Sequence, residues 1–205
     1  MTRFFVVEPI GLGTLSVECM SSLLQRIAVA HGVTRHQFLT YLRDWWRKEH
    51  HRHLPRCEEL RWDGYSKNVE IGLAALRDAF GLDFSSCTLI ALKEACAANG
   101  IGSIKHYRSW CPACFRDDLA AQGPTYDRLL WRIQGYERCS IHKHKLISIC
   151  PYCSCTQRSD TTRAELHECS NCYQNLALHD TRSTYSRAPM FGEAQLERLV
   201  GDLHV

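Results

Sequence analysis

CSIHKHKLISICPYC, at residues 139–153, holds a Cys-x-x-His pair and a Cys-x-x-Cys pair with seven residues between them. A Cys-x-x-Cys pair lies before this segment, with 24 residues between, and another follows it, with 15 residues between. A gap of two residues lets both side chains of a pair turn onto one metal cation. The four pairs therefore predict metal binding by eight residues: Cys111, Cys114, Cys139, His142, Cys150, Cys153, Cys169 and Cys172.

The order of the pairs predicts two zinc centres, each completed by two successive pairs. The third and fourth pairs have a spacing typical of zinc sites. The first and second pairs enclose a longer stretch, but their ends are equally specific. Because four protein ligands fill a tetrahedron and leave no place for a catalytic water, we expect both zinc ions to be structural. They would stabilise a region that is poor in aliphatic residues.

Some ligand choices stay open at this point. Cys155 could replace Cys153, His144 could replace His142, and His167 could enter the second centre. The pairs could also interleave, the first with the third and the second with the fourth. We favour the sequential order because only seven residues join the second and third pairs. The other cysteines are expected to be buried free thiols: Cys19, Cys57, Cys87 and Cys96.

The composition is that of a globular protein, with 45% hydrophobic and 23% charged residues among 205. The N-terminus, MTRFFVVEPIGLGTL, has no h-region or small-residue cleavage site, so we expect no secretory signal. No apolar run approaches the roughly 18 residues that cross a bilayer. Paired cysteines without a secretory signal favour metal over disulfides and predict a reducing, cytoplasmic setting. The net charge of +3 is mildly basic and does not by itself require nucleic acid.

The first half of the chain is predicted to be helical. After an irregular segment over residues 1–15, apolar side chains recur with helical spacing from Met20 to Ala28, and Gly32 can end that helix. Thr34 can cap a second helix over 35–48. Further helices are expected at 66–79, 85–98, 126–133 and 192–203.

The predicted fold class is mainly α, with small zinc-ribbon or knuckle modules. Three regions are expected: an N-terminal helical region at 1–106, a tandem zinc-finger region at 107–178 and a C-terminal helical tail at 179–205.

The first two helices have features of a helix-turn-helix, since small Ala28 would face the second helix and Gly32 would make the turn. The alternative is an ordinary helical hairpin with a solvated polar face. In the first case the second helix and its end would contact DNA or a partner through polar and basic side chains: Arg35, His36, Gln37, Thr40, Arg43, Arg47 and Lys48. In the zinc region, exposed aromatic side chains are expected to suit contacts with proteins: Tyr126, Tyr136 and Tyr152.

Two blocks of sequence resemble the TniQ family, which includes TnsD-like proteins. The first is ECMSSLLQRIA at 18–28, closing with His31-Gly32. The second is Trp110-Cys-Pro-Ala-Cys114, followed by Leu-Trp-Arg at 130–132, Cys-Ser-Ile-His at 139–142 and Cys-Pro-Tyr-Cys at 150–153. The resemblance spans roughly residues 8–175. Three positions depart from the family pattern without removing a metal ligand: Cys19, His31 and Ser140.

The resemblance implies a bacterial adaptor for transposon target-site selection. Such proteins link an element that recognises the target to an AAA+ ATPase regulator similar to TnsC, with DNA in the complex. The recogniser is a DNA-binding extension or a CRISPR effector complex with guide RNA. The length favours the short adaptor type or a truncated chain.

Two other classes of function are weighed against the adaptor. One is a zinc-stabilised transcription regulator that uses the same helix-turn-helix. The other is an enzyme, which we do not expect, because the sequence has neither an open metal-site motif nor a phosphate-binding glycine loop.

Overall fold

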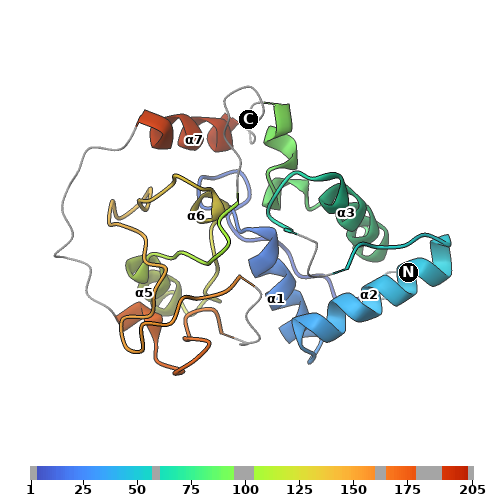
Figure 1. Ribbon diagram of the computed structural model, residues 1–205, viewed down its shortest axis with the longest axis horizontal. Helices are drawn as coiled ribbons and strands as arrows, with labels where there is room; N and C mark the ends of the chain where they lie inside the picture. Colours follow the sequence, from blue (N-terminus) through green and yellow to red (C-terminus); the bar gives the residue numbers. More distant parts are fainter. Residues whose placement is uncertain (1–3, 57–60, 95–103, 160–164, 179–190, 203–205) are drawn as a thin grey trace.

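The computed structural model describes residues 4–56, 61–94, 104–159, 165–178 and 191–202. In this part of the chain the fold is mainly helical, and extended segments pair only through isolated antiparallel bridges. Figure 1 shows α1, α2 and α3 together on one side, the Cys-rich loops around α5 and α6 on the other, and α7 along one edge. None of the described helices is both long enough and apolar enough to cross a membrane.

The helices begin and end as follows: α1 Met20–Ala30, α2 Arg35–His50, α3 Lys67–Phe80, α5 Pro112–Ala120, α6 Leu129–Arg132 and α7 Phe191–Asp202. Three short 3-10 turns are also present among the described residues: η2 Ser85–Cys87, η3 Ile90–Leu92 and η4 Leu176–Leu178.

The turn between α1 and α2 confirms the predicted breaks. Gly32 has φ 67°, the Gly32 N–H donates to Val29 O at 2.9 Å, and the Val33 N–H donates to Ala28 O at 3.0 Å. These two bonds form a Schellman motif, which satisfies the last carbonyls of α1. Thr34 then caps α2 in a capping box with Gln37. α2 extends to His50, two residues beyond the predicted end.

α3 confirms the predicted third helix. Ser66 caps its first turn, and Gly81, at φ 72°, ends it. The three helices enclose one apolar core, in which the largest contributions come from aromatic and branched side chains: Phe4, Leu24, Ile27, Phe38, Leu42, Trp46, Leu76, Phe80 and Phe84.

The helix predicted at 85–98 is wrong over 85–92, which form two 3-10 turns separated by extended Thr88, whereas residues 93–94 are helical. The Thr88 hydroxyl accepts the Ile90 N–H at 3.2 Å, and the Leu89 N–H donates to the distant Asp63 O at 3.0 Å. Side-chain and long-range partners thus take the donors that a helix needs. Residues 95–98 lie outside the described residues.

Two further predictions change in the second half. The helix expected at 126–133 shrinks to four-residue α6, because the preceding backbone pairs with the entry segment: the Cys19 N–H donates to Asp127 O and the Leu129 N–H to Val17 O. Helix α5 was not predicted, although Pro112 occupies its first turn, where proline is favoured. α7 confirms the last predicted helix up to Asp202.

The two sides of the molecule are joined by buried aspartates. Asp63 accepts hydrogen bonds from the Ser21 N–H (2.7 Å), the Ser21 hydroxyl (2.9 Å) and Arg132 Nε (2.8 Å). The Asp127 carboxylate accepts two from Arg108, at 2.6 and 2.9 Å. Both pairs are almost wholly buried. Asp63 connects α1 to α6, and Asp127, whose N–H donates to the Ser22 hydroxyl of α1 at 3.2 Å, connects α1 to Arg108 in the segment before α5. The helical and Cys-rich sides therefore share one interior.

The second apolar core also crosses the predicted regional boundaries. It gathers Val17 and Leu89 with Trp110 and Trp131, and it includes Leu196 and Val200 of α7. The three predicted regions stay a prediction about domain organisation.

Candidate metal centres

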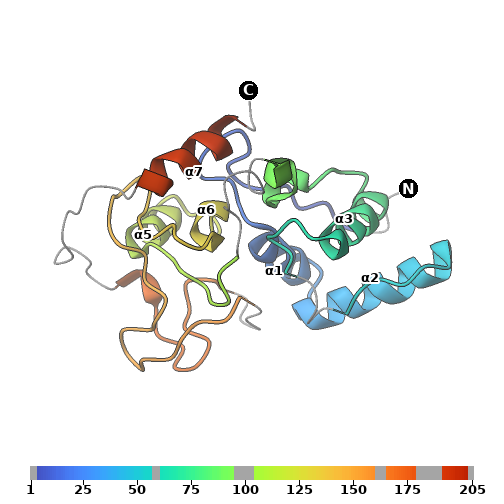
Figure 2. The ribbon, with the colours of Figure 1, turned by 45° about the horizontal axis from the view of Figure 1, so that its top comes forward.

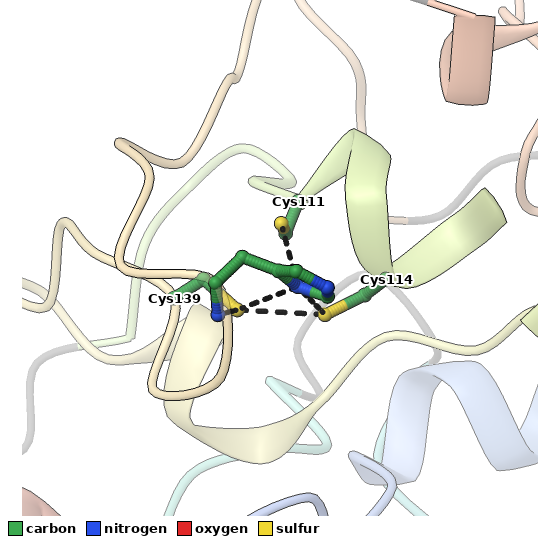
Figure 3. A group of neighbouring side chains, drawn as sticks. Cys111, Cys114 and Cys139 are labelled. Carbon is green, nitrogen blue, oxygen red and sulfur yellow. Dashed lines mark hydrogen bonds between the residues drawn. The ribbon is translucent and has the colours of Figure 1, made fainter. Parts of the chain in front are cut away.

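The first centre gathers four ligand atoms from α5 and one loop. Cys111 is the N-cap residue of α5 and Cys114 lies in its first turn, so a helix start carries the first pair. Cys139 and His142 come from the loop that follows α6. His142 Nδ1 lies 3.6 Å from the Cys111 sulfur and 3.3 Å from the Cys114 sulfur, and the Cys114 and Cys139 sulfurs are 3.4 Å apart. Figure 3 shows the side chains of Cys111, Cys114 and Cys139 pointing toward a common point.

The second centre is built from two loops. The Cys150 and Cys172 sulfurs are 3.7 Å apart, and so are those of Cys153 and Cys169. In each centre the four ligand atoms lie within 4.8 Å of one another. All of these cysteines are free thiols rather than disulfides.

Three of the four pairs share one loop geometry. If the first ligand is residue i, its N–H donates to the carbonyl of i+5, its own carbonyl accepts from the N–H of i+4, and residues i−1 and i+6 form an antiparallel bridge. Residue i+4 has positive φ in each loop: Lys143 (58°), Ser154 (58°) and Tyr173 (63°). The loops begin at Cys139, Cys150 and Cys169.

This geometry decides the alternatives left open by the sequence. His144 and Cys155 both occupy position i+5, whose backbone carbonyl accepts the N–H of the first ligand. The second ligand side chain of each pair comes from position i+3 instead. The Cys155 sulfur lies 3.5 Å from Thr156 O and outside both clusters. His167 contacts the Thr125 hydroxyl instead. The clusters follow the sequential order of the pairs, not the interleaved one.

The distances fit zinc. A Zn–S bond of about 2.3 Å in a tetrahedron places two sulfurs about 3.8 Å apart. The two sulfur pairs of the second centre, at 3.7 Å, are close to this value. Each centre could therefore hold one zinc ion, in agreement with the two structural zinc ions predicted. All four positions of each tetrahedron would be filled by protein, so the metal would supply structure rather than an open site for water.

The thiols of each centre shift one another's pKa in both directions: hydrogen bonds with Cys111 and Cys139 raise the pKa of Cys114 far above its usual range. Hydrogen bonds from Cys111 and Cys114 hold the pKa of Cys139 far below its usual range. In the second centre the hydrogen bond from Asn171, followed by that from the Cys155 backbone, lowers the pKa of Cys153 to about 6. Zinc binds the thiolate form, so metal binding would release the protons of those ligand thiols whose pKa is raised.

Sequence reasoning missed the side chains that orient the ligands. His142 presents Nδ1 to the cysteines, while its Nε2 lies 2.9 Å from the Asp117 carboxylate of α5. Such a carboxylate fixes the ring and its tautomer. At the second centre, Gln157 Nε2 donates to the Cys169 sulfur at 3.3 Å. The sequence feature that could have identified Asp117 as an orienting residue is its position three residues after Cys114, on the same helical face.

The predicted contact residues on α2 are only partly free. Arg35 donates to Ser21 O at 3.3 Å and to Ser159 O at 2.7 Å, and Gln37 belongs to the capping box. His36, Arg47 and Lys48 are exposed, and Thr40 and Arg43 are half-buried. Both ribbon views place α2 at the outer edge of the molecule (Figures 1 and 2). The role of these residues in binding stays a prediction.

Two of the three aromatic side chains expected at the surface are buried. Tyr126 lies under the Arg128 guanidinium, which is 3.9 Å from the ring centroid, and the Tyr136 hydroxyl donates to Glu197 of α7 at 2.9 Å. Tyr152 is exposed, as predicted. Burial of Tyr136 was missed because its partner lies 61 positions away along the chain, whereas the partner of Tyr126, Arg128, is only two residues away.

Comparison with known proteins supports the resemblance in the two sequence blocks. The TniQ family model matches residues 9–146, which is more than half of the 205-residue chain. The match includes α1 to α3 and all of the first metal centre. No curated protein matches the chain. The chain therefore belongs to the TniQ family, whose role is associated with the selection of target sites in transposition.

Proposed function

We propose that this protein is a non-catalytic adaptor in transposon target-site selection. It would link an element that recognises target DNA to an AAA+ ATPase regulator of the TnsC type, in a reducing cytoplasm. The recogniser would be a DNA-binding protein or a CRISPR effector complex with its guide RNA. The observation that carries the proposal is family membership combined with two closed Cys/His clusters, since closed clusters suit a scaffold and not a hydrolytic centre.

The arrangement of the fold supports an adaptor in a second way. The buried Asp63 and Asp127 networks hold the helical and Cys-rich sides together, so the two sides would present their surfaces in a constant relation. One surface is the basic outer part of α2, with Arg43, Arg47 and Lys48. The other is formed by the metal-binding loops, which expose Ile141, Ile149, Tyr152 and Tyr173.

We assign the α2 surface to the regulator or nearby DNA, and the loop surface to the recogniser. Exposed aromatic and branched side chains on constrained loops suit protein contacts, because they bury area at a low cost in conformational entropy. Contact with DNA through α2, in the manner of a helix-turn-helix, belongs to the same proposal.

The test is a pull-down with the zinc-loaded chain and the AAA+ regulator and target recogniser of the same transposon. We expect the chain to capture each partner separately, and the two partners to co-purify only when the chain is present. If regulator and recogniser associate equally well without the chain, or if the chain captures neither, the adaptor function is wrong.

Variants can separate the two surfaces. Arg43→Glu with Arg47→Glu should weaken capture of one partner while zinc content and capture of the other stay unchanged. Arg77→Glu is the matched control, because it reverses an exposed charge on α3. Equal loss of both partners, or no change in either, would contradict the two-surface division.

A further inference from the structure

A polar pocket of about 470 Å³ lies beside the first metal-binding loop, and none of its lining residues is among those named for the two surfaces above. One wall is the segment before α5, with Lys105, His106 and Ser109. The other wall contains Glu137 and Lys145, which flank the loop that begins at Cys139. The walls thus carry two ammonium groups and one carboxylate.

Lys105 is the unusual group in this pocket. Its side chain is buried, and its Nζ donates to the Ser109 hydroxyl at 2.9 Å and to Tyr136 O at 2.6 Å. An ammonium group has three N–H donors, so one remains for another acceptor. Burial, together with the nearby Arg132, lowers the pKa of Lys105 to about 8, which leaves it mainly cationic at neutral pH.

The other buried cations within the described residues have carboxylate partners. Each of the three buried arginines forms an ion pair with an aspartate: Arg108 with Asp127, Arg128 with Asp118 and Arg132 with Asp63. Within the described ranges, Lys105 has no carboxylate within ion-pair distance. Glu137 and Glu193 act on Lys105 from beyond ion-pair distance, and their attraction does not offset the effects of burial and of Arg132, so an anion in the pocket would stabilise the ammonium group.

The loop beside the pocket adds one more cation, Arg138. Arg138 and Lys145 form an antiparallel bridge, which places these like charges directly opposite each other. Like charges in such a pair are destabilising. At the rim, Arg61 donates to a ring nitrogen of His106 at 3.2 Å. The pocket and its edge therefore bring together Arg61, Lys105, Arg138 and Lys145, against the carboxylate of Glu137.

We propose that this pocket receives a backbone phosphate of a nucleic acid, held by Lys105 from within and by Lys145 and Arg138 at its edge. A phosphodiester offers oxygens for the remaining Lys105 donor and for the two edge cations at once, and its charge relieves their mutual repulsion. A strand passing over the pocket would place one phosphate inside it and the neighbouring phosphates along the loop. The contact is to the backbone and would not select a base sequence.

The test uses the full-length, zinc-loaded chain and fluorescence anisotropy with labelled 20-bp duplex DNA and 20-nucleotide RNA of arbitrary sequence. Lys145→Gln and Arg138→Gln should each weaken binding about fivefold at low salt and reduce the slope of log K against log salt by about one. Arg77→Gln, which removes an exposed charge from α3, is the matched control and should change neither quantity.

Lys105→Met tests the interior of the pocket. It removes the ammonium and keeps a side chain of similar length, so it should weaken binding by a similar factor without loss of zinc. A similar loss of affinity for DNA and for RNA supports a phosphate site. A loss of affinity for only one of them shows which nucleic acid the pocket binds.

Three outcomes would overturn the proposal: unchanged binding in all pocket variants, an equal loss in Arg77→Gln, or preferential binding of a labelled poly-glutamate peptide. The proposal is independent of the adaptor function. A chain that binds nucleic acid through this pocket but captures no AAA+ regulator would support the pocket and contradict the adaptor.

Discussion

At the scale of the residue, each metal-binding loop uses a backbone conformation that side chains disfavour. Lys143, Ser154 and Tyr173 all have positive φ although none is glycine. Left-handed backbone costs a non-glycine residue roughly 1 kcal/mol. The loops adopt it because this conformation aims the N–H of i+4 at the carbonyl of the first ligand, and metal binding can offset the cost.

The same loop geometry predicts which cysteine matters to the metal. Cys114→Ser should remove the metal from the first centre and reduce the zinc content from about two ions per chain to about one, since serine is a poor zinc ligand. Cys155→Ser, in which only the side chain at i+5 changes, should retain both. Elemental analysis of protein purified without chelator measures the content. Loss of zinc in Cys155→Ser would show that the ligand assignment is wrong.

We predict that the contact between the helical and Cys-rich sides depends on Asp63 more than on any other residue for its stability. Asp63→Ala leaves the Arg132 guanidinium buried without its carboxylate and removes the acceptor of Ser21. Breaking a buried ion pair of this kind destabilises a protein by about 3–5 kcal/mol. Urea denaturation followed by circular dichroism measures the change.

The matched control is Asp44→Ala, because Asp44 is half exposed and its pairs with Arg43 and Arg47 are on the surface. Pairs of this kind contribute about 0–1 kcal/mol. Similar losses in the two variants would contradict a special role for the buried aspartate.

At the scale of the element, capping side chains close in sequence determine where a helix ends, whereas hydrogen bonds with distant segments can shorten it. Ser66 and Gly81 mark the ends of α3 almost to the residue. α6 is short because residues 127 and 129 bond with the backbone at 17 and 19, which is more than a hundred positions away. Caps act within one turn, so only they are visible in a single window of sequence.

The cap of α2 gives a prediction at this scale. Thr34→Ala should destabilise the protein by about 1 kcal/mol, because the N–H of Gln37 loses its acceptor and the capping box opens. For a chain of this size that corresponds to a fall in Tm of about 2–4 °C. Thr34→Ser keeps the hydroxyl and should stay close to the parent Tm. A fall of equal size in both variants would exclude the hydroxyl as the cause.

At the scale of the whole molecule, the metal centres are part of the common interior and not an appendage. Five of their cysteines belong to the apolar core that includes Val17, Leu89 and α7: Cys111, Cys114, Cys139, Cys150 and Cys169. Their ligand positions therefore also determine where the entry segment and the last helix can pack.

Removal of zinc is therefore expected to affect the helical side too. A chelator should lower the Tm of the far-ultraviolet circular dichroism signal, which comes mainly from α1, α2 and α3. With zinc bound, this transition and that of tryptophan fluorescence should coincide, as they do in two-state unfolding. If the helical signal melts at the same temperature with and without chelator, the two sides unfold independently and this prediction fails.

The sequence by itself determined the four ligand pairs and most helix ends, because ligand spacing and caps act over a few residues. Family membership was visible for the same reason, in short blocks of adjacent residues. The choice among the alternative ligands and the sequential order of the pairs were decided by the loop geometry of the fold. Only the tertiary structure decided that 85–92 would form 3-10 turns, that Tyr126 and Tyr136 would be buried and that Asp117 would orient His142. Each of these outcomes rests on a partner or a packing surface remote along the chain or across the fold, and the free energy of such contacts depends on the fold that brings the residues together.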